Sequence, residues 1–294
     1  MTFNGIYTPI ITPFDESGVI DYVKMKHNLE KWGKTDLDGI VVLGSNGEFV
    51  YLTEAEKLEV IQFAVNNFTK AKKIIAGVSC ESTAETIETA KKAADLGVDA
   101  VLVLPPHYYR GAMKDEILYG YFTDVADSSP VPVMLYNMPG NTGINLSSAL
   151  IARLSNHPNI AGVKDTGGNI VQLAETVRDT DDNFSVFAGN TGYLMPALAV
   201  GARGATLALA NILPQECCDL VKLVRENRYE EAKALQLKLL KINTLVTGKY
   251  GVSGLKAAMA MLGYEGGVPR KPLKPASEEA REEIKAELEK IGVL

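Results

Sequence analysis

The chain has 294 residues, of which 46% are hydrophobic and 22% charged, and its formal net charge at pH 7 is −6. This composition is ordinary for a globular protein and is sufficient for one large domain or two unequal ones. The net negative charge does not indicate the basic surface that is typical of nucleic-acid-binding proteins. The three cysteines have no metal-ligand spacing to any histidine, so neither a disulfide framework nor a metal site is indicated. There is no signal-peptide pattern and no apolar run near the ~18 residues of a membrane span, so we expect a cytoplasmic protein.

Apolar β-rich runs alternate with helical patterns along most of the chain. Asp21 is placed to cap one helix, and Thr53 with Glu56 matches a capping box at the start of another. The predicted strands are residues 6–12, 39–43, 73–77, 100–104, 131–136, 160–164, 184–188 and 204–209. The predicted helices between them are residues 21–32, 53–68, 83–96, 114–126, 147–154, 170–178 and 193–200.

This alternation predicts an α/β protein with a parallel sheet. Eight such units in about 200 to 250 residues fit a (β/α)8 TIM barrel. The alternative is an open doubly wound sheet, which should carry a glycine-rich phosphate turn after the first strand, and residues 8–13 are not one. After Leu209 only helical patterns follow, so we predict a barrel catalytic domain over 1–226 and a helical C-terminal domain over 227–294.

One lysine stands out at the end of a buried strand. The apolar residues 160–163 lead into Lys164, and Gly167 with Gly168 then stops the strand. A lysine on apolar walls has its charged form disfavoured, and the neutral amine can attack a ketone to form a Schiff base. The alternative is an ordinary strand-end lysine whose charged head reaches water.

Polar residues follow the other predicted strands at the end where TIM-barrel active sites lie. Lys164 would supply the amine, Tyr136 would carry protons, and Ser45, bridged to Tyr108, would relay protons to solvent. Backbone N–H groups around Ser45 and Asn46 would hold a carboxylate, which makes a 2-oxo acid the expected small-molecule substrate. Glu48 is interpreted as a structural residue that closes the turn. Each residue alone is typical of a turn or a packing position, and their joint placement around Lys164 favours an active site.

These motifs resemble the dihydrodipicolinate synthase / N-acetylneuraminate lyase family of class I pyruvate aldolases, from Gly5 to about Leu273. They are Thr8-Pro9 with Thr12-Pro13-Phe14, Gly44 to Glu48, Tyr136 to Pro139, Gly162 to Asp165, and Gly189-Asn190. The resemblance implies a barrel with a helical C-terminal domain, a homotetramer built as a dimer of dimers, and no metal or organic cofactor.

The same resemblance implies site roles, residue by residue. Lys164 forms the Schiff base with the substrate, Tyr136 carries protons, and the residue at Tyr108 reaches into a neighbouring subunit's site. The implied substrate-binding residues are Ser45, Asn46, Thr12, Thr166, Gly189 and Asn141. Phe49 and Glu81 stand where some synthases bind feedback lysine, which argues against that regulation.

Several stretches are more similar to 4-hydroxy-2-oxoglutarate aldolases, which release pyruvate and glyoxylate. Asn141 stands where the synthases place an arginine that binds the carboxylate of aspartate semialdehyde, and Thr166 stands where the aldolase has a serine. We therefore expect a class I lyase that cleaves 4-hydroxy-2-oxoglutarate. The alternatives are a 4-hydroxy-tetrahydrodipicolinate (dihydrodipicolinate) synthase and, in another class, a non-catalytic barrel that binds a 2-oxo acid.

Overall fold

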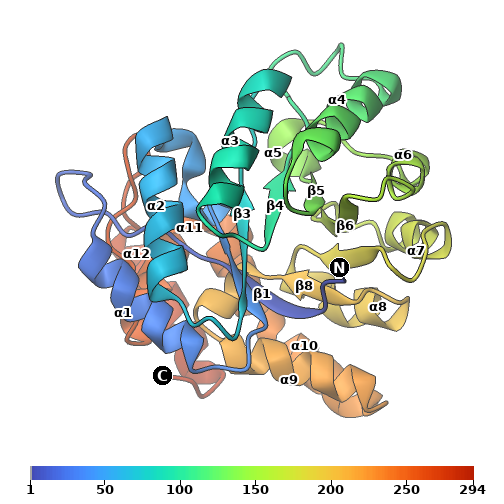
Figure 1. Cartoon of the computed structure of the whole chain (residues 1–294). Helices are drawn as coiled ribbons and strands as arrows, with labels where there is room; N and C mark the ends of the chain where they lie inside the picture. Colours follow the sequence, from blue (N-terminus) through green and yellow to red (C-terminus); the bar gives the residue numbers. More distant parts are fainter. Residues whose placement is uncertain (1) are drawn as a thin grey trace.

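The computed structural model describes residues 2–294 and contains a closed barrel of eight parallel strands in the order β1 to β8 (Figure 1). Strand β8 pairs back onto β1, with Gly204 opposite Gly5, so the sheet has no open edge. The predicted (β/α)8 barrel is confirmed, and the open-sheet alternative is wrong. The strands are β1 (Gly5–Pro9), β2 (Gly39–Val42), β3 (Lys73–Gly77), β4 (Ala100–Val103), β5 (Val133–Asn137), β6 (Ile160–Asp165), β7 (Ser185–Ala188) and β8 (Gly204–Thr206).

Helices follow the strands as predicted and form the outer ring of the barrel (Figure 1). The Asp21 carboxylate accepts a hydrogen bond from the Lys24 N–H, and Thr53 and Glu56 form the predicted capping box. The barrel helices are α1 (Tyr22–Gly33), α2 (Glu54–Asn67), α3 (Thr83–Asp95), α4 (Asp115–Ser128), α5 (Pro139–Thr142), α6 (Ser148–Leu154), α7 (Ile170–Arg178), α8 (Leu194–Ala199) and α9 (Pro214–Arg225).

Six strands are shorter than predicted, most of all β1 and β8, and several short elements were not predicted. β1 ends at Pro9, where an irregular segment begins, and β8 ends at Thr206, just before the 3₁₀ helix η4 (Ala208–Asn211). The short elements carry too few residues to show an apolar period. Besides η4 and α5, they are the 3₁₀ helices η1 (Ser45–Gly47), η2 (Phe49–Tyr51) and η3 (Thr191–Tyr193) and the π-helical turn η5 (Leu245–Lys249).

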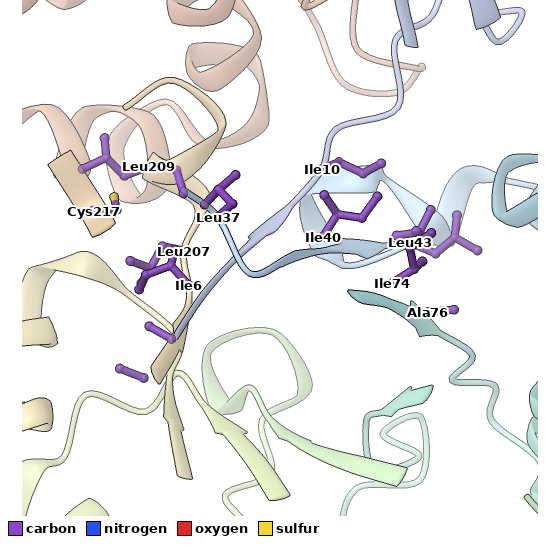
Figure 2. Close-up of a cluster of buried hydrophobic side chains, with 14 of the residues drawn as sticks. Ile6, Ile10, Leu37, Ile40, Leu43, Ile74, Ala76, Leu207, Leu209 and Cys217 are labelled. Carbon is purple, nitrogen blue, oxygen red and sulfur yellow. The ribbon is translucent and has the colours of Figure 1, made fainter. Parts of the chain in front are cut away.

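The strands separate an inner from an outer core. Ile6, Ile40 and Ile74 face outward, where they join Leu207 and Cys217 in the layer beneath the helices (Figure 2). The alternate residues face inward, so Tyr7 and Phe187 meet inside the barrel with ring centroids 5.6 Å apart. Because these rings fill the interior, the barrel is a packed core rather than a pore.

The last three helices are α10 (Tyr229–Thr244), α11 (Gly251–Met261) and α12 (Glu278–Lys290). α10 packs on α9 and reaches η3, where Gln236 donates to the Thr191 carbonyl (2.8 Å) and accepts from the Met195 N–H (3.0 Å). The C-terminal helices therefore touch the barrel beside the ends of β7 and β8. The domain boundary between residues 226 and 227 stays a prediction. None of the helices described within residues 2–294 combines the length and apolar character needed to cross a membrane.

Candidate active site

A cavity of about 370 Å³ lies at the carboxyl ends of the strands. It contains most of the residues that the sequence predicted for the site. Those that line it are Ser45, Asn46, Tyr136, Asn141, Lys164, Thr166 and Gly189. The predicted residues Thr12 and Tyr108 are not among its lining residues.

Lys164 lies on β6 and is only 3% exposed, so the alternative of a solvent-seeking strand-end lysine is wrong. Its strand partner is Tyr136 on β5, and the Lys164 Nζ lies 3.9 Å from the centroid of the Tyr136 ring. Within residues 2–294 the amine has no carboxylate partner in ion-pair range. The amine is therefore buried at the cavity wall without a counter-charge, a position from which a lysine side chain can act as a nucleophile.

The Tyr136 hydroxyl connects the lysine to the turn after β2. It lies 3.4 Å from the Ser45 Oγ, across the mouth of the barrel. The phenol is therefore near both the amine and a second hydroxyl in the same cavity, a placement suited to moving protons during addition and elimination.

The turn that carries Ser45 and Asn46 is η1. The Thr12 hydroxyl donates to the Gly47 carbonyl (2.8 Å), so Thr12 is buried beneath the turn and supports it rather than lining the cavity. Glu48 ends the turn in the left-handed conformation with φ of 56°, which is uncommon for a residue with a side chain. Backbone N–H groups around Ser45 and Asn46 can receive a carboxylate there.

Glu48 is a buried structural residue, as expected, and its partner is a lysine that the sequence did not reveal. Lys256 of α11 lies 2.6 Å from the Glu48 carboxylate, and the two side chains are 2% and 1% exposed. The Lys256 Nζ also donates to the carbonyls of Thr12 and Val268, both at 2.8 Å, and the Arg270 N–H donates to Glu48 at 2.8 Å. Burial lowers the pKa of Lys256 to about 8, against the opposing effect of the Glu48 charge.

On the other side of the lysine, Thr166 is held by its neighbours. Its hydroxyl donates to the Asn137 carbonyl (2.6 Å), and the Asn137 amide donates to the Asp165 carboxylate (2.7 Å). Burial raises the pKa of Asp165, while the hydrogen bonds from Asn137 and the Gly167 N–H oppose that rise. Gly189 is required here because a Cβ at this position would lie 2.1 Å from the Thr166 methyl carbon.

Tyr108 lies apart from the cavity, on an exposed loop. It is 77% exposed and packs edge-on against Tyr109, with ring centroids 5.0 Å apart. The Glu81 carboxylate holds the loop by accepting from the Tyr108 N–H (2.9 Å). Within one chain, over residues 2–294, the predicted Ser45–Tyr108 hydrogen bond does not form.

Part of the cavity wall was missed from the sequence. The β8 region contributes Thr206 and Ala208, and the C-terminal helices contribute Thr247 and Gly248 of η5 with Gly251 and Val252 of α11. A signal was present, because glycines inside a helical pattern often mark a packing or functional constraint. The residues that the structure describes contain no cluster of three or more His, Cys, Asp or Glu side chains that could hold a metal ion.

A family model and the curated relatives of this chain indicate one enzyme family. The family model described as the dihydrodipicolinate synthetase family matches residues 2–291. The chain is 34% identical over 291 residues to a 4-hydroxy-tetrahydrodipicolinate synthase of Caldicellulosiruptor saccharolyticus, covering 99% of this chain and 98% of the relative. It is 36% identical over 282 residues to a probable mitochondrial 4-hydroxy-2-oxoglutarate aldolase of Emericella nidulans, covering 94% and 91%.

Solved structures agree with these relatives. A dihydrodipicolinate synthase from Bacillus anthracis is 32% identical and superposes with a TM-score of 0.94, covering 98% of this chain and 99% of that one. A dihydrodipicolinic acid synthase family protein from E. coli K12, solved in complex with pyruvate, is 29% identical with a TM-score of 0.94 over 100% of both chains. These findings argue against the non-catalytic alternative. The chain belongs to the dihydrodipicolinate synthetase family and is a pyruvate-dependent lyase of the class I aldolase type.

Proposed function

We propose that this enzyme cleaves 4-hydroxy-2-oxoglutarate to pyruvate and glyoxylate through a Schiff base on Lys164. The observation that carries the proposal is the Lys164 amine, buried without a counter-charge in a cavity that also holds Tyr136 and Asn141. The side chain itself is the covalent catalyst, so the proposed reaction requires no metal or organic cofactor.

In the proposed reaction the Lys164 Nζ adds to C2 of the 2-oxo acid, and the ketone oxygen leaves as water. The resulting iminium draws electrons from the C3–C4 bond while Tyr136 takes the proton of the C4 hydroxyl, and this releases glyoxylate. The enamine is then protonated at C3, and water hydrolyses the Schiff base to give pyruvate and free Lys164. Throughout, the turn at Ser45 and Asn46 would hold the C1 carboxylate.

The first test traps the covalent intermediate. Borohydride added with pyruvate should leave a stable adduct on Lys164, detected by peptide mass spectrometry, and the Lys164→Ala variant should give neither adduct nor turnover. A folded wild-type protein that yields no adduct would overturn the Schiff-base assignment.

The second test concerns the substrate. Pyruvate release from 4-hydroxy-2-oxoglutarate, followed in a coupled assay, should be fast for the wild-type enzyme. An adduct on Lys164 without such release would keep the Schiff base and reject this substrate.

A second candidate is condensation of pyruvate with aspartate semialdehyde, as the name of the Caldicellulosiruptor relative suggests. Asn141 lines the cavity without the guanidinium that would bind the acceptor's carboxylate in two parallel hydrogen bonds. Asn141→Arg should therefore increase condensation with aspartate semialdehyde. If the wild type already condenses it efficiently and the variant does not improve, the synthase is the better assignment.

We also propose that the chain assembles as a homotetramer, a dimer of dimers. The two adjacent tyrosines support this proposal, because Tyr108 and Tyr109 are 77% and 73% exposed. Large aromatic side chains side by side on a surface are typical of a protein interface.

A further inference from the structure

Thr206 is a buried hydroxyl without a partner at the wall of the cavity. It is the last residue of β8, is 1% exposed, and lines the same cavity as Lys164. Among the described residues its Oγ1 has no hydrogen-bond partner. Because a buried hydroxyl that makes no hydrogen bond costs stability, its presence calls for an explanation in the working enzyme.

The barrel geometry places Thr206 at the height of the lysine. Lys164 pairs with Phe187 on β7, and Phe187 pairs with Gly204 on β8. In a (β/α)8 barrel, side chains at one height come from alternate strands, and the register advances about one residue per strand. β8 lies two strands beyond β6, so the residue of β8 at the height of Lys164 stands two positions after Gly204, which is Thr206. The side chains of Lys164 and Thr206 therefore belong to the same inward-facing layer.

Building on the proposed Schiff-base function, we infer that the Thr206 hydroxyl donates a hydrogen bond to the C2 oxygen of the 2-oxo acid while Lys164 adds. In that step the Nζ–C2 bond forms and the C2=O double bond becomes a C–O single bond. One nitrogen proton passes to that oxygen through Tyr136, and the Tyr136 phenol then gives the resulting hydroxyl a second proton. The C–O bond breaks, water leaves, and the iminium and the Tyr136 phenolate remain. The oxygen gains negative charge as the amine attacks, so a hydroxyl held in the same layer stabilises the transition state.

The chain offers a matched control in Thr8. Thr8 lies on β1, is 0% exposed, and its Oγ1 likewise has no partner among the described residues. It stands between Tyr7, which faces the barrel interior, and Pro9, which lines the cavity. Because successive side chains of a strand alternate, Thr8 faces the outer side. It therefore has the chemistry and burial of Thr206 without access to the substrate.

The test follows adduct formation by rapid quenching with borohydride at fixed pyruvate concentration. Pyruvate isolates the addition step because it carries no C4 group. Thr206→Val keeps the shape and removes the hydroxyl, and should slow adduct formation roughly tenfold, the effect of one lost hydrogen bond. Thr206→Ser should remain near the wild-type rate, and Thr8→Val should match the wild type. Thr206→Val should also unfold at a temperature no lower than the wild type, since it removes an unpaired polar group.

Each outcome decides the inference. Equal rates for Thr206→Val and the wild type would overturn it and leave Thr206 holding only a water molecule. Equal slowing by Thr206→Val and Thr8→Val would also overturn it, because a general packing effect would then be sufficient. If the valine variant does not fold, Thr206→Ser against Thr206→Ala makes the same comparison. A wild type that forms no adduct rejects the proposed function itself, a result distinct from those above.

Discussion

At the scale of single residues, the site depends on strand register. Tyr136 and Lys164 are direct partners across β5 and β6, which places the phenol ring against the amine. The register shifts between Val133 and Met134, so an irregularity in the same strand pair lies below these two side chains. Moving either strand by one residue would turn one of these side chains to the outer face of the barrel.

Tyr136→Phe should reduce kcat by roughly 10² or more, because it removes the hydroxyl of the proposed proton carrier and leaves the ring beside Lys164. Steady-state kinetics measure the effect. Tyr7→Phe is the matched control, since Tyr7 also faces the barrel interior but lies outside the cavity wall. Comparable activity of the Tyr136→Phe variant and the wild type would remove Tyr136 from the proposed mechanism.

The proposed nucleophile and the residues around it in the cavity were predictable at this scale, and the residues that support them from beneath were not. Lys164 follows an apolar run and precedes two glycines, which is a local signal. Lys256 forms its ion pair with Glu48 more than 200 positions away, a relation that no local pattern carries. Thr206 was within a predicted strand, but without the register of the closed barrel nothing distinguishes it from an outward-facing threonine.

At the scale of elements, α11 and η1 are fastened together by the Lys256–Glu48 pair. Lys256→Met leaves the Glu48 carboxylate buried and unpaired, which should cost about 3–5 kcal/mol of unfolding free energy. Urea denaturation measures this cost, and Glu48→Gln/Lys256→Met should be less destabilised than the single variant. Lys233→Met, at the exposed pair with Glu230, should have almost no effect. A single variant as stable as the wild type would show that the pair does not hold these elements.

The same pair predicts a pH dependence. The pKa of Lys256 is lowered to about 8 in the folded protein, against about 10.4 in an unfolded chain. Between these values the unfolded chain binds more protons, so unfolding free energy contributed by Lys256 rises with pH through this window and is lowest below about 8. The wild type should therefore gain stability relative to Glu48→Gln/Lys256→Met between pH 8 and about 10.4. A constant difference would contradict the lowered pKa.

Long elements were readable from the sequence, and the short ones at the mouth of the barrel were not. α7 has the predicted bounds because its apolar face and its polar cap at Asn169 give clear signals. η1, α5 and η5 span one turn or little more, so they show no period. These elements carry Ser45, Asn141 and Thr247 to the cavity. The sequence therefore predicted which residues belong to the site but not the backbone structure that forms the cavity wall.

At the scale of the whole molecule, the fold followed from the count of β/α units, whereas assembly did not. A single chain presents Tyr108 on an exposed loop, outside its own cavity. In a symmetric dimer the same surface patch of both subunits forms the interface. A residue that one subunit contributes to its neighbour's site is therefore also contributed by the neighbour to the first subunit's site. If Tyr108 serves the site of an adjacent subunit, activity depends on assembly, and the oligomer becomes part of the active site.

Subunit mixing tests this dependence. Tyr108→Phe and Lys164→Ala should each be strongly impaired alone. When the two are unfolded and refolded together in equal amounts, a mixed dimer contains one site with both Lys164 and a neighbour's intact Tyr108. Random pairing should therefore restore about a quarter of the wild-type sites.

Mixing the variants without refolding is the control, and it should restore little activity if subunits exchange slowly. If refolded mixtures show only the sum of the separate activities, Tyr108 does not act across the subunit interface, because a residue working within its own chain cannot be supplied by another.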